Sequence, residues 1–196
     1  MSRNAHRPVV IYISAASDLM AEREALGRII ATLPVTLVWR IVQTPTAGES
    51  LDLEALQAAD LHLLVMGGDI RAPVGLEWRV SRRARRPLVA FLKEGIPRTP
   101  AGRVFLQEAG IVWRPFTDAA DLSRRVQRLL AEHLLRHMTR YALTPAEVER
   151  LEGLLTEEEK GEKEEALEGE GAGRSAVVLS RERFVPSEGV TVDLNS

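Results

Sequence analysis

The residues that could do chemistry lie in two short segments, each at the start of an expected helix. In the first, the apolar run from Val9 to Ile13 ends in small residues that include Ser14 and Ser17. A strand, a small-residue turn and a helix start together bind anions and nucleotides in open α/β folds. In the second, a lone carboxylate, Glu77, follows a loop containing proline and glycine. The two segments indicate a nucleotide-handling fold and leave open whether it is an enzyme.

Apolar runs rich in β-branched residues alternate with amphipathic helical stretches along most of the chain. This alternation is typical of a parallel sheet covered by helices on both faces. Right-handed crossovers favour the flavodoxin-like strand order 2-1-3-4-5. We therefore predict a three-layer α/β fold with a five-stranded parallel sheet. The predicted strands are residues 8–13, 35–42, 61–66, 88–92 and 111–114.

Ligands of such sheets bind outside the carboxyl ends of the strands, where the strand order reverses. This geometry predicts that Ser14, Ser17 and the loop before Glu77 meet in one crevice with the turn after the third strand. We also expect Ser17 or Asp18 to cap the first helix. The turn after the third strand supplies three further candidate ligand-binding residues, Gly67, Gly68 and Asp69.

A cluster of arginines lies on the helix expected after the third strand. Helical spacing directs Leu76, Val80 and Ala84 towards the core and the arginines outwards. One interpretation is a solvated helix surface, the usual location of helix charges. In the other, the cluster binds phosphates: Arg79 and Arg82 hold the pyrophosphate of a dinucleotide, or the arginines contact a nucleic-acid backbone.

Composition excludes several classes of function. Cysteine is absent, which removes disulfides and thiolate chemistry. The sequence shows no apolar run long enough to span a bilayer and no signal peptide, so we expect a cytoplasmic protein without a membrane partner. His133 and His137 have helical spacing, but a metal site needs further ligands, so no metal is predicted. We predict no cofactor and do not expect nucleic acid as a partner.

The charge divides the chain into two parts. Residues 1–143 hold 20 basic and 14 acidic residues (+6), whereas residues 144–196 hold 6 and 14 (−8), which sums to the net charge of −2. We expect an α/β domain over 1–143, an acidic helix and flexible linker over 144–173, and a β-like or disordered segment over 174–196. Thr144 and Glu147 have the spacing of a capping box at the start of the acidic helix.

The segment YISAASDLMAEREAL resembles the opening signature of a family of unknown function related to Toll/interleukin-1 receptor (TIR) domains. That family is found N-terminal to bacterial signalling ATPases of the STAND class. Ala15 stands where the family has a second serine, and the spacer is one residue shorter. ADLHLLVMGGD and VGLEWRVSRRARRPLVAFL resemble later blocks of the same family, so the resemblance covers residues 8–137. The matching residues of the opening signature are Ser14, Asp18, Glu22, Arg23 and Glu24.

The resemblance implies a TIR-like fold akin to nucleoside deoxyribosyltransferases, in which a glutamate acts at an N-glycosidic bond. Glu77 is the matching residue, and a carboxylate there can stabilise or trap an oxocarbenium-like ribose. A nicotinamide leaving group is already cationic, so no strong acid is required. We therefore expect a nucleotide N-glycosidase acting on NAD or a related nucleotide in bacterial defence or stress signalling. The alternative is a non-catalytic module that assembles with itself or with a signalling partner, in which Glu77 only complements the helix dipole.

Overall fold

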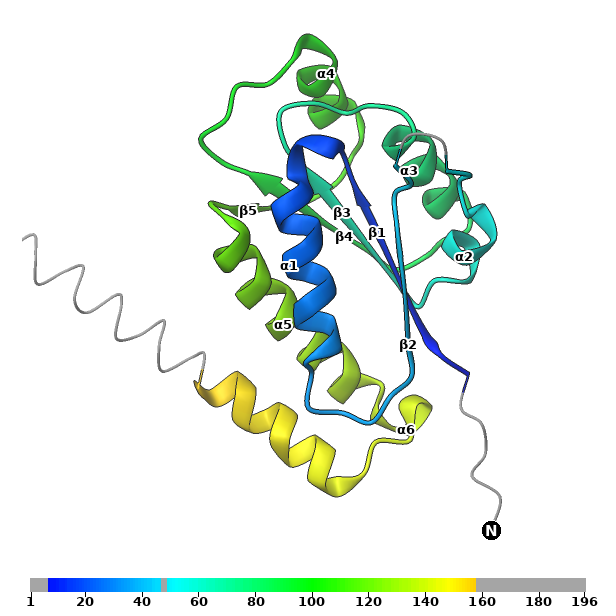
Figure 1. Cartoon of the computed structure of the whole chain (residues 1–196), viewed down its shortest axis with the longest axis vertical. Coiled ribbons are helices and arrows are strands. Elements are labelled where there is room, and N and C mark those ends of the chain that lie inside the picture. Colours follow the sequence, from blue (N-terminus) through cyan, green and yellow to red (C-terminus); the bar gives the residue numbers. More distant parts are fainter. Residues whose placement is uncertain (1–6, 47–48, 158–196) are drawn as a thin grey trace, which may run out of the picture. The chain divides into compact units, whose positions relative to one another are not determined.

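The computed structural model describes residues 7–46 and 49–157. Within these residues five parallel strands form one sheet in the order β2-β1-β3-β4-β5 (Figure 1). The predicted flavodoxin-like α/β fold is therefore confirmed. The strands are β1 Val9–Ala15, β2 Trp39–Gln43, β3 Leu61–Met66, β4 Leu88–Lys93 and β5 Trp113–Phe116.

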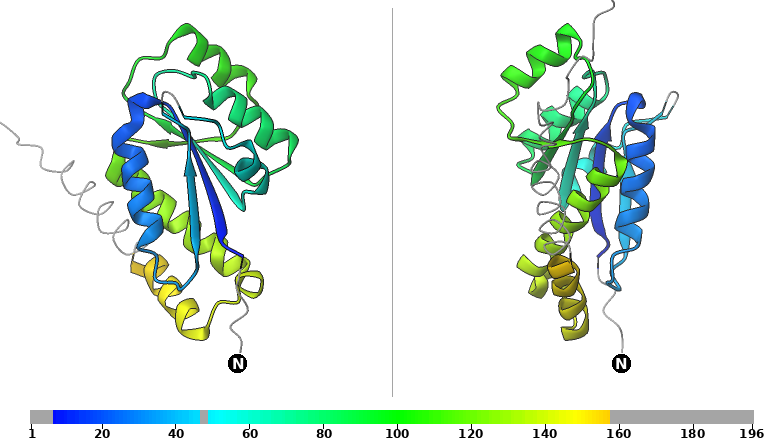
Figure 2. Two further views of the ribbon diagram at one scale, coloured as in Figure 1. Left: turned by 45° about the vertical axis from the view of Figure 1, so that its right-hand side comes forward. Right: turned by 90° about the vertical axis from the view of Figure 1, so that its left-hand side faces the viewer.

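Helices cover both faces of the sheet (Figure 2). On one face α1 packs against α5, and on the other α2 and α3 contact β1. Because β1 lies between these layers, its side chains alternate between two cores: Ile11 and Ile13 join the cluster beneath α1 and α5, whereas Tyr12 joins the cluster beneath α2. The helices are α1 Met20–Ala31, α2 Leu53–Ala58, α3 Val74–Arg83, α4 Pro100–Glu108, α5 Ala119–Arg136 and α6 Met138–Tyr141.

Two predicted strand boundaries and one predicted cap are wrong. The second strand begins at Trp39, not at residue 35, because its partner β1 begins pairing only at Val9, opposite Trp39. The fifth strand is displaced by two residues, because Trp113 pairs with Ala90 of β4. A short 3₁₀ turn (Ser17–Leu19) precedes α1, and no side chain caps either element.

Asp18 contacts the neighbouring turn instead of capping the helix. Its carboxylate accepts a hydrogen bond of 3.3 Å from the amide of Gly68. The start of the first helical segment is thereby tied to the turn after β3, which places both beside the carboxyl ends of the central strands.

A further helix begins at residue 145 and is described through residue 157. Its predicted capping box is present: Glu147 accepts from the amide of Thr144 at 2.8 Å, and the Thr144 hydroxyl accepts from the amide of Glu147 at 3.3 Å. Leu151 is fully buried in the core beneath α1 and α5. The predicted linker beyond 157 and the predicted β-like end lie outside the described residues. In the described part of the chain, no helix has the length and apolar character needed to cross a membrane.

Candidate functional site

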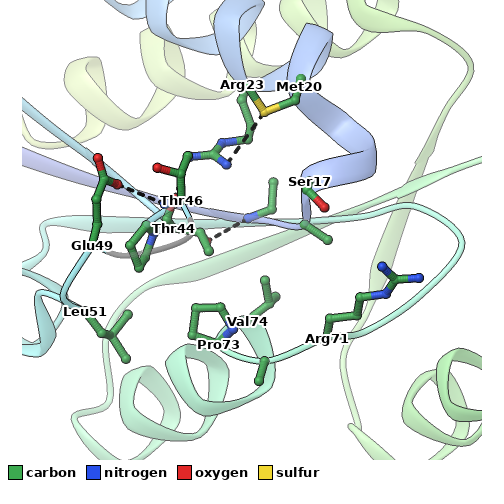
Figure 3. A pocket seen from close by; sticks show the side chains of 14 residues that line it. Ser17, Met20, Arg23, Thr44, Thr46, Glu49, Leu51, Arg71, Pro73 and Val74 are labelled. Carbon is green, nitrogen blue, oxygen red and sulfur yellow. Dashed lines mark hydrogen bonds between the residues drawn. The ribbon is translucent and has the colours of Figure 1, made fainter.

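A pocket of about 550 Å³ lies at the carboxyl ends of β1 and β2 and at the start of α3 (Figure 3). Its wall combines the turn after β1, the loop after β2 and the loop that leads into α3. This is the switch point at which the strand order predicts a ligand. The polar and charged residues in its lining are Ser17, Arg23, Thr44, Thr46, Glu49 and Arg71. Of the predicted ligand-binding residues, only Ser17 is among them.

Glu77 lies next to this pocket and is fully buried. The hydroxyl of Tyr12 donates to Oε1 at 2.8 Å, and the hydroxyl of Thr44 donates to Oε2 at 2.8 Å. Burial raises the pKa of Tyr12, and the Glu77 carboxylate raises it further, so the phenol remains a donor. Thr44 also lines the pocket, so the Glu77 carboxylate contacts a residue of the pocket wall but does not itself line the pocket.

The inward face of α3 differs from the predicted one. Leu76 is 49% exposed, while Val74, Glu77 and Ser81 are buried at helical spacing. Val80 packs against the cluster beneath α2 as predicted, so the prediction is wrong for Leu76 and not for the whole face. Hydroxyl donors on β1 and after β2 satisfy the carboxylate and make the observed orientation stable.

Ser14 does not join the pocket. Its side chain is fully buried, and its Oγ lies 2.7 Å from Nε2 of His62 on the adjacent strand β3. Burial lowers the pKa of His62 to about 3, so the imidazole is neutral at physiological pH. The serine and histidine form a buried polar contact between sheet strands, and the expected meeting of Ser14 with an open crevice does not occur.

The turn after β3 packs against the start of the first helical segment and against α4. A side chain on Gly67 would place its Cβ 2.6 Å from Oδ2 of Asp18, so the Asp18 carboxylate, which accepts from the amide of Gly68, would have to shift. The carbonyl of Gly68 lies close to α4, and Asp69 accepts hydrogen bonds from the hydroxyl of Thr99 and the guanidinium of Arg71. None of the three predicted turn residues is in the described lining of the pocket.

Arg79 and Arg82 lie at a different groove. This groove, of about 490 Å³, is formed by α3 and α4 and includes Trp78 and Phe105. The guanidinium of Arg82 lies over the Trp78 ring, 5.5 Å from its centroid. The structure therefore separates both arginines from the pocket beside Glu77.

The residues that sequence reasoning missed are Tyr12, Thr44 and, as a pocket residue, Arg23. Tyr12 was placed only as a buried strand residue, and Thr44 only in a loop. The sequence did carry a signal for Tyr12: side chains of a strand alternate between its two faces, and Tyr12 is a hydroxyl-bearing residue on the face of β1 that meets α3. Thr44 carried no comparable signal, because its contact with Glu77 spans 33 residues of sequence.

Comparison with protein-family models gives no match, and no curated protein matches the chain. Among solved structures, a CMP N-glycosidase, BcmB, from Clostridium botulinum aligns with a TM-score of 0.40 and 13% identity, over 59% of this chain and 97% of that chain. CapF, solved with the inhibitor 3-isopropenyl-tropolone, aligns with a TM-score of 0.35 and 18% identity, over 55% of this chain and 29% of that chain. The fold assignment above rests on the strand order and pairing.

Proposed function

We propose that this domain is a nucleotide N-glycosidase in which Glu77 acts at the bond between ribose and base. The observation that carries the proposal is the environment of that carboxylate. Glu77 is fully buried, and its side-chain partners among the described residues are two neutral hydroxyls, those of Tyr12 and Thr44. Because Glu77 has no salt-bridge partner among the described residues, no ion pair among them occupies this buried acidic group, and a cationic ligand can act as its electrostatic partner.

The chemistry of an N-glycosidic bond uses such a charge directly. As the bond to the base breaks, positive charge develops on the ribose ring, and a carboxylate can stabilise that charge or trap the sugar covalently. The carboxylate is most effective where water is excluded and its orientation is fixed in advance. Two hydrogen bonds of 2.8 Å, one from Tyr12 on β1 and one from Thr44 after β2, fix the orientation of Glu77.

Access to Glu77 passes by Thr44, whose hydroxyl contacts the carboxylate and whose side chain lines the pocket. A rotation of this one side chain would free Oε2, and rotamer changes of this size commonly accompany ligand binding. The ribose would then lie over Thr44 with its reacting carbon towards Glu77. Val74, one turn earlier on α3, would pack against the ligand from the same side.

NAD is the first substrate to test, because the resemblance of the opening segment to the TIR-like family supports it and because nicotinamide leaves without a strong acid. The same resemblance supports a role in cytoplasmic defence or stress signalling. The experiment is to incubate the full chain with NAD, NADP, nicotinamide mononucleotide and the common ribonucleoside monophosphates, and to detect released base. We expect release from at least one of them by the wild type and a large loss in Glu77→Gln. No release from any nucleotide would overturn the proposal in favour of the non-catalytic assembly module.

A further inference from the structure

Arg23 is a buried cation at the wall of the pocket. Its relative exposure is 6%, although it lies on the first turns of α1 beside open space. Figure 3 shows Arg23 with Met20 and Ser17 on one side of the pocket, opposite Arg71, Pro73 and Val74. Its protein partners are neutral: the side-chain oxygen of Gln43, the carbonyl of Thr44 and the sulfur of Met20.

Among the described residues, no carboxylate near Arg23 forms an ion pair with it. Glu22 pairs with Lys93 at 2.6 Å, and Glu24 pairs with Arg28 at 3.8 Å. Glu49 lines the same pocket and accepts a hydrogen bond of 2.9 Å from the amide of Thr46. It forms no ion pair with Arg23, although the hydrogen bonds from Thr46 and, to a smaller extent, the charge of Arg23 lower its pKa. Within residues 7–46 and 49–157, Arg23 therefore has no salt-bridge partner. A guanidinium removed from water is costly unless an anion compensates it.

The guanidinium also keeps donors available. Of its five N–H groups, three have the protein acceptors named above, which leaves two. The bonds to Gln43 and Thr44 hold the planar group in place, and the Thr44 carbonyl is only 2.5 Å from its terminal nitrogen. Pre-ordered guanidinium donors in a pocket match the oxygens of a phosphate.

Thr44 connects this cation to the proposed catalytic group. Its carbonyl accepts from Arg23, and its hydroxyl donates to Glu77. The guanidinium of Arg23 and the carboxyl group of Glu77 are thus both held by Thr44, one through its carbonyl and the other through its hydroxyl. This arrangement suits a molecule that carries a phosphate and a glycosidic carbon on the same ribose.

We infer that Arg23 is the phosphate anchor of this pocket, and that the pocket binds ribose 5′-phosphates in preference to the corresponding nucleosides. The inference rests on the proposed function for the identity of the sugar, whereas the anion site stands on the environment of Arg23. Arg71, at the opposite wall and paired with Asp69 at 3.1 Å, supplies a second and more exposed positive charge.

The test measures binding by calorimetry on the full chain carrying Glu77→Gln, which suppresses turnover. It compares the affinity for nicotinamide mononucleotide with that for nicotinamide riboside. Inorganic phosphate serves as an independent probe of the anion site. We expect the mononucleotide to bind at least about tenfold more tightly than the riboside, the effect of one or two charge-assisted hydrogen bonds. Adding Arg23→Gln should remove most of this difference and weaken phosphate binding. Arg28→Gln, an exposed arginine on the same helix outside the pocket, should leave both unchanged.

Arg23→Lys provides the second arm if Arg23→Gln is poorly folded, because it keeps the charge and loses the planar donor pair. It should retain part of the preference for the mononucleotide. Equal affinity for mononucleotide and riboside, or full preference retained in a folded Arg23→Gln or Arg23→Lys protein, would overturn the inference. Binding of phosphate that depends on Arg23, in a protein that cleaves no nucleotide, would support the anion site and refute only the N-glycosidase.

Discussion

Two buried carboxylates at different parts of the sheet are satisfied in different ways. Asp60, just before β3, is 5% exposed and accepts hydrogen bonds from the guanidinium groups of Arg7 and Arg140 and from the amide of Val10. Glu77, beside the pocket at the carboxyl ends of the strands, is fully buried and accepts only from the hydroxyls of Tyr12 and Thr44 among the described residues.

The difference separates a structural acid from a candidate functional one. A carboxylate with two cations and an amide is fully compensated, so its charge is used within the fold. A carboxylate with two hydroxyls is oriented but little neutralised, and it keeps acceptor capacity for a ligand. The Asp60 end of the sheet also includes Tyr141 and Arg140, which connect it to α6. The Glu77 end instead borders a pocket.

The largest expected effect is the loss of turnover in Glu77→Gln. The amide keeps the size of the side chain but removes the charge that stabilises the ribose cation, which should cost on the order of a hundredfold in rate. The free energy of unfolding should stay within about 1 kcal/mol of the wild type, because removing an uncompensated buried charge offsets the poorer hydrogen bonding. Base release and urea unfolding measure the two effects. Glu24→Gln, an exposed carboxylate on α1, is the control and should change neither.

A smaller effect, on stability and not on turnover, is expected for Asp60→Asn. The change leaves two arginines without their anion, and both are more than half exposed, so we expect a loss of about 1–2 kcal/mol. The amide of Val10 keeps an acceptor in the asparagine oxygen. Urea unfolding checks the value. A base-release rate reduced as far as in Glu77→Gln would break the distinction between the two acids.

Tyr12→Phe should reduce turnover by about tenfold, the effect of losing one oriented hydrogen bond to Glu77. Because Glu77 then keeps Thr44 as its only described partner, the loss should appear in kcat more than in KM. Steady-state kinetics on matched preparations measure this ratio. An unchanged kcat would show that Tyr12 only fills the core.

The smallest effect concerns acid stability at Glu147. Burial alone would raise the pKa of this carboxyl, but hydrogen bonds from the amides and hydroxyls of Thr144 and Thr36 lower it to about 2. A depressed pKa stabilises the fold above the ordinary value of 4.5, and this contribution is lost as the pH falls towards 2. Glu147→Gln should therefore cost about 1 kcal/mol at pH 7 and less at pH 3. Urea unfolding at both pH values tests this, and a cost that grows in acid would contradict it.

Local patterns were sufficient for the strand order and for the capping box at Glu147. Both depend on residues close in sequence, such as the alternation of strands with helices and the spacing of Thr144 and Glu147. The same glutamate also accepts from Thr36, 111 residues away, which no local pattern indicates.

The candidate site was only partly predictable from the sequence, because several of its contacts join residues far apart in the chain. Glu77 and the region of the crevice followed from the β-α-β order, and Ser17 lies in the pocket lining. The burial of Glu77 in place of Leu76 depends on the hydroxyl of Tyr12, 65 residues away, and on Thr44. Arg79 and Arg82 lie at the groove of α3 and α4 and not at the pocket near Glu77, because helical spacing gives a face but not the element packed against it.

The most direct test measures base release and the free energy of unfolding on the same preparations of wild type, Glu77→Gln and Asp60→Asn. The account predicts opposite results for the two variants: Glu77→Gln keeps its stability and loses about a hundredfold in turnover, whereas Asp60→Asn loses stability and keeps its turnover. Equal turnover by the wild type and a folded Glu77→Gln would contradict the central claim that this carboxylate acts on the substrate.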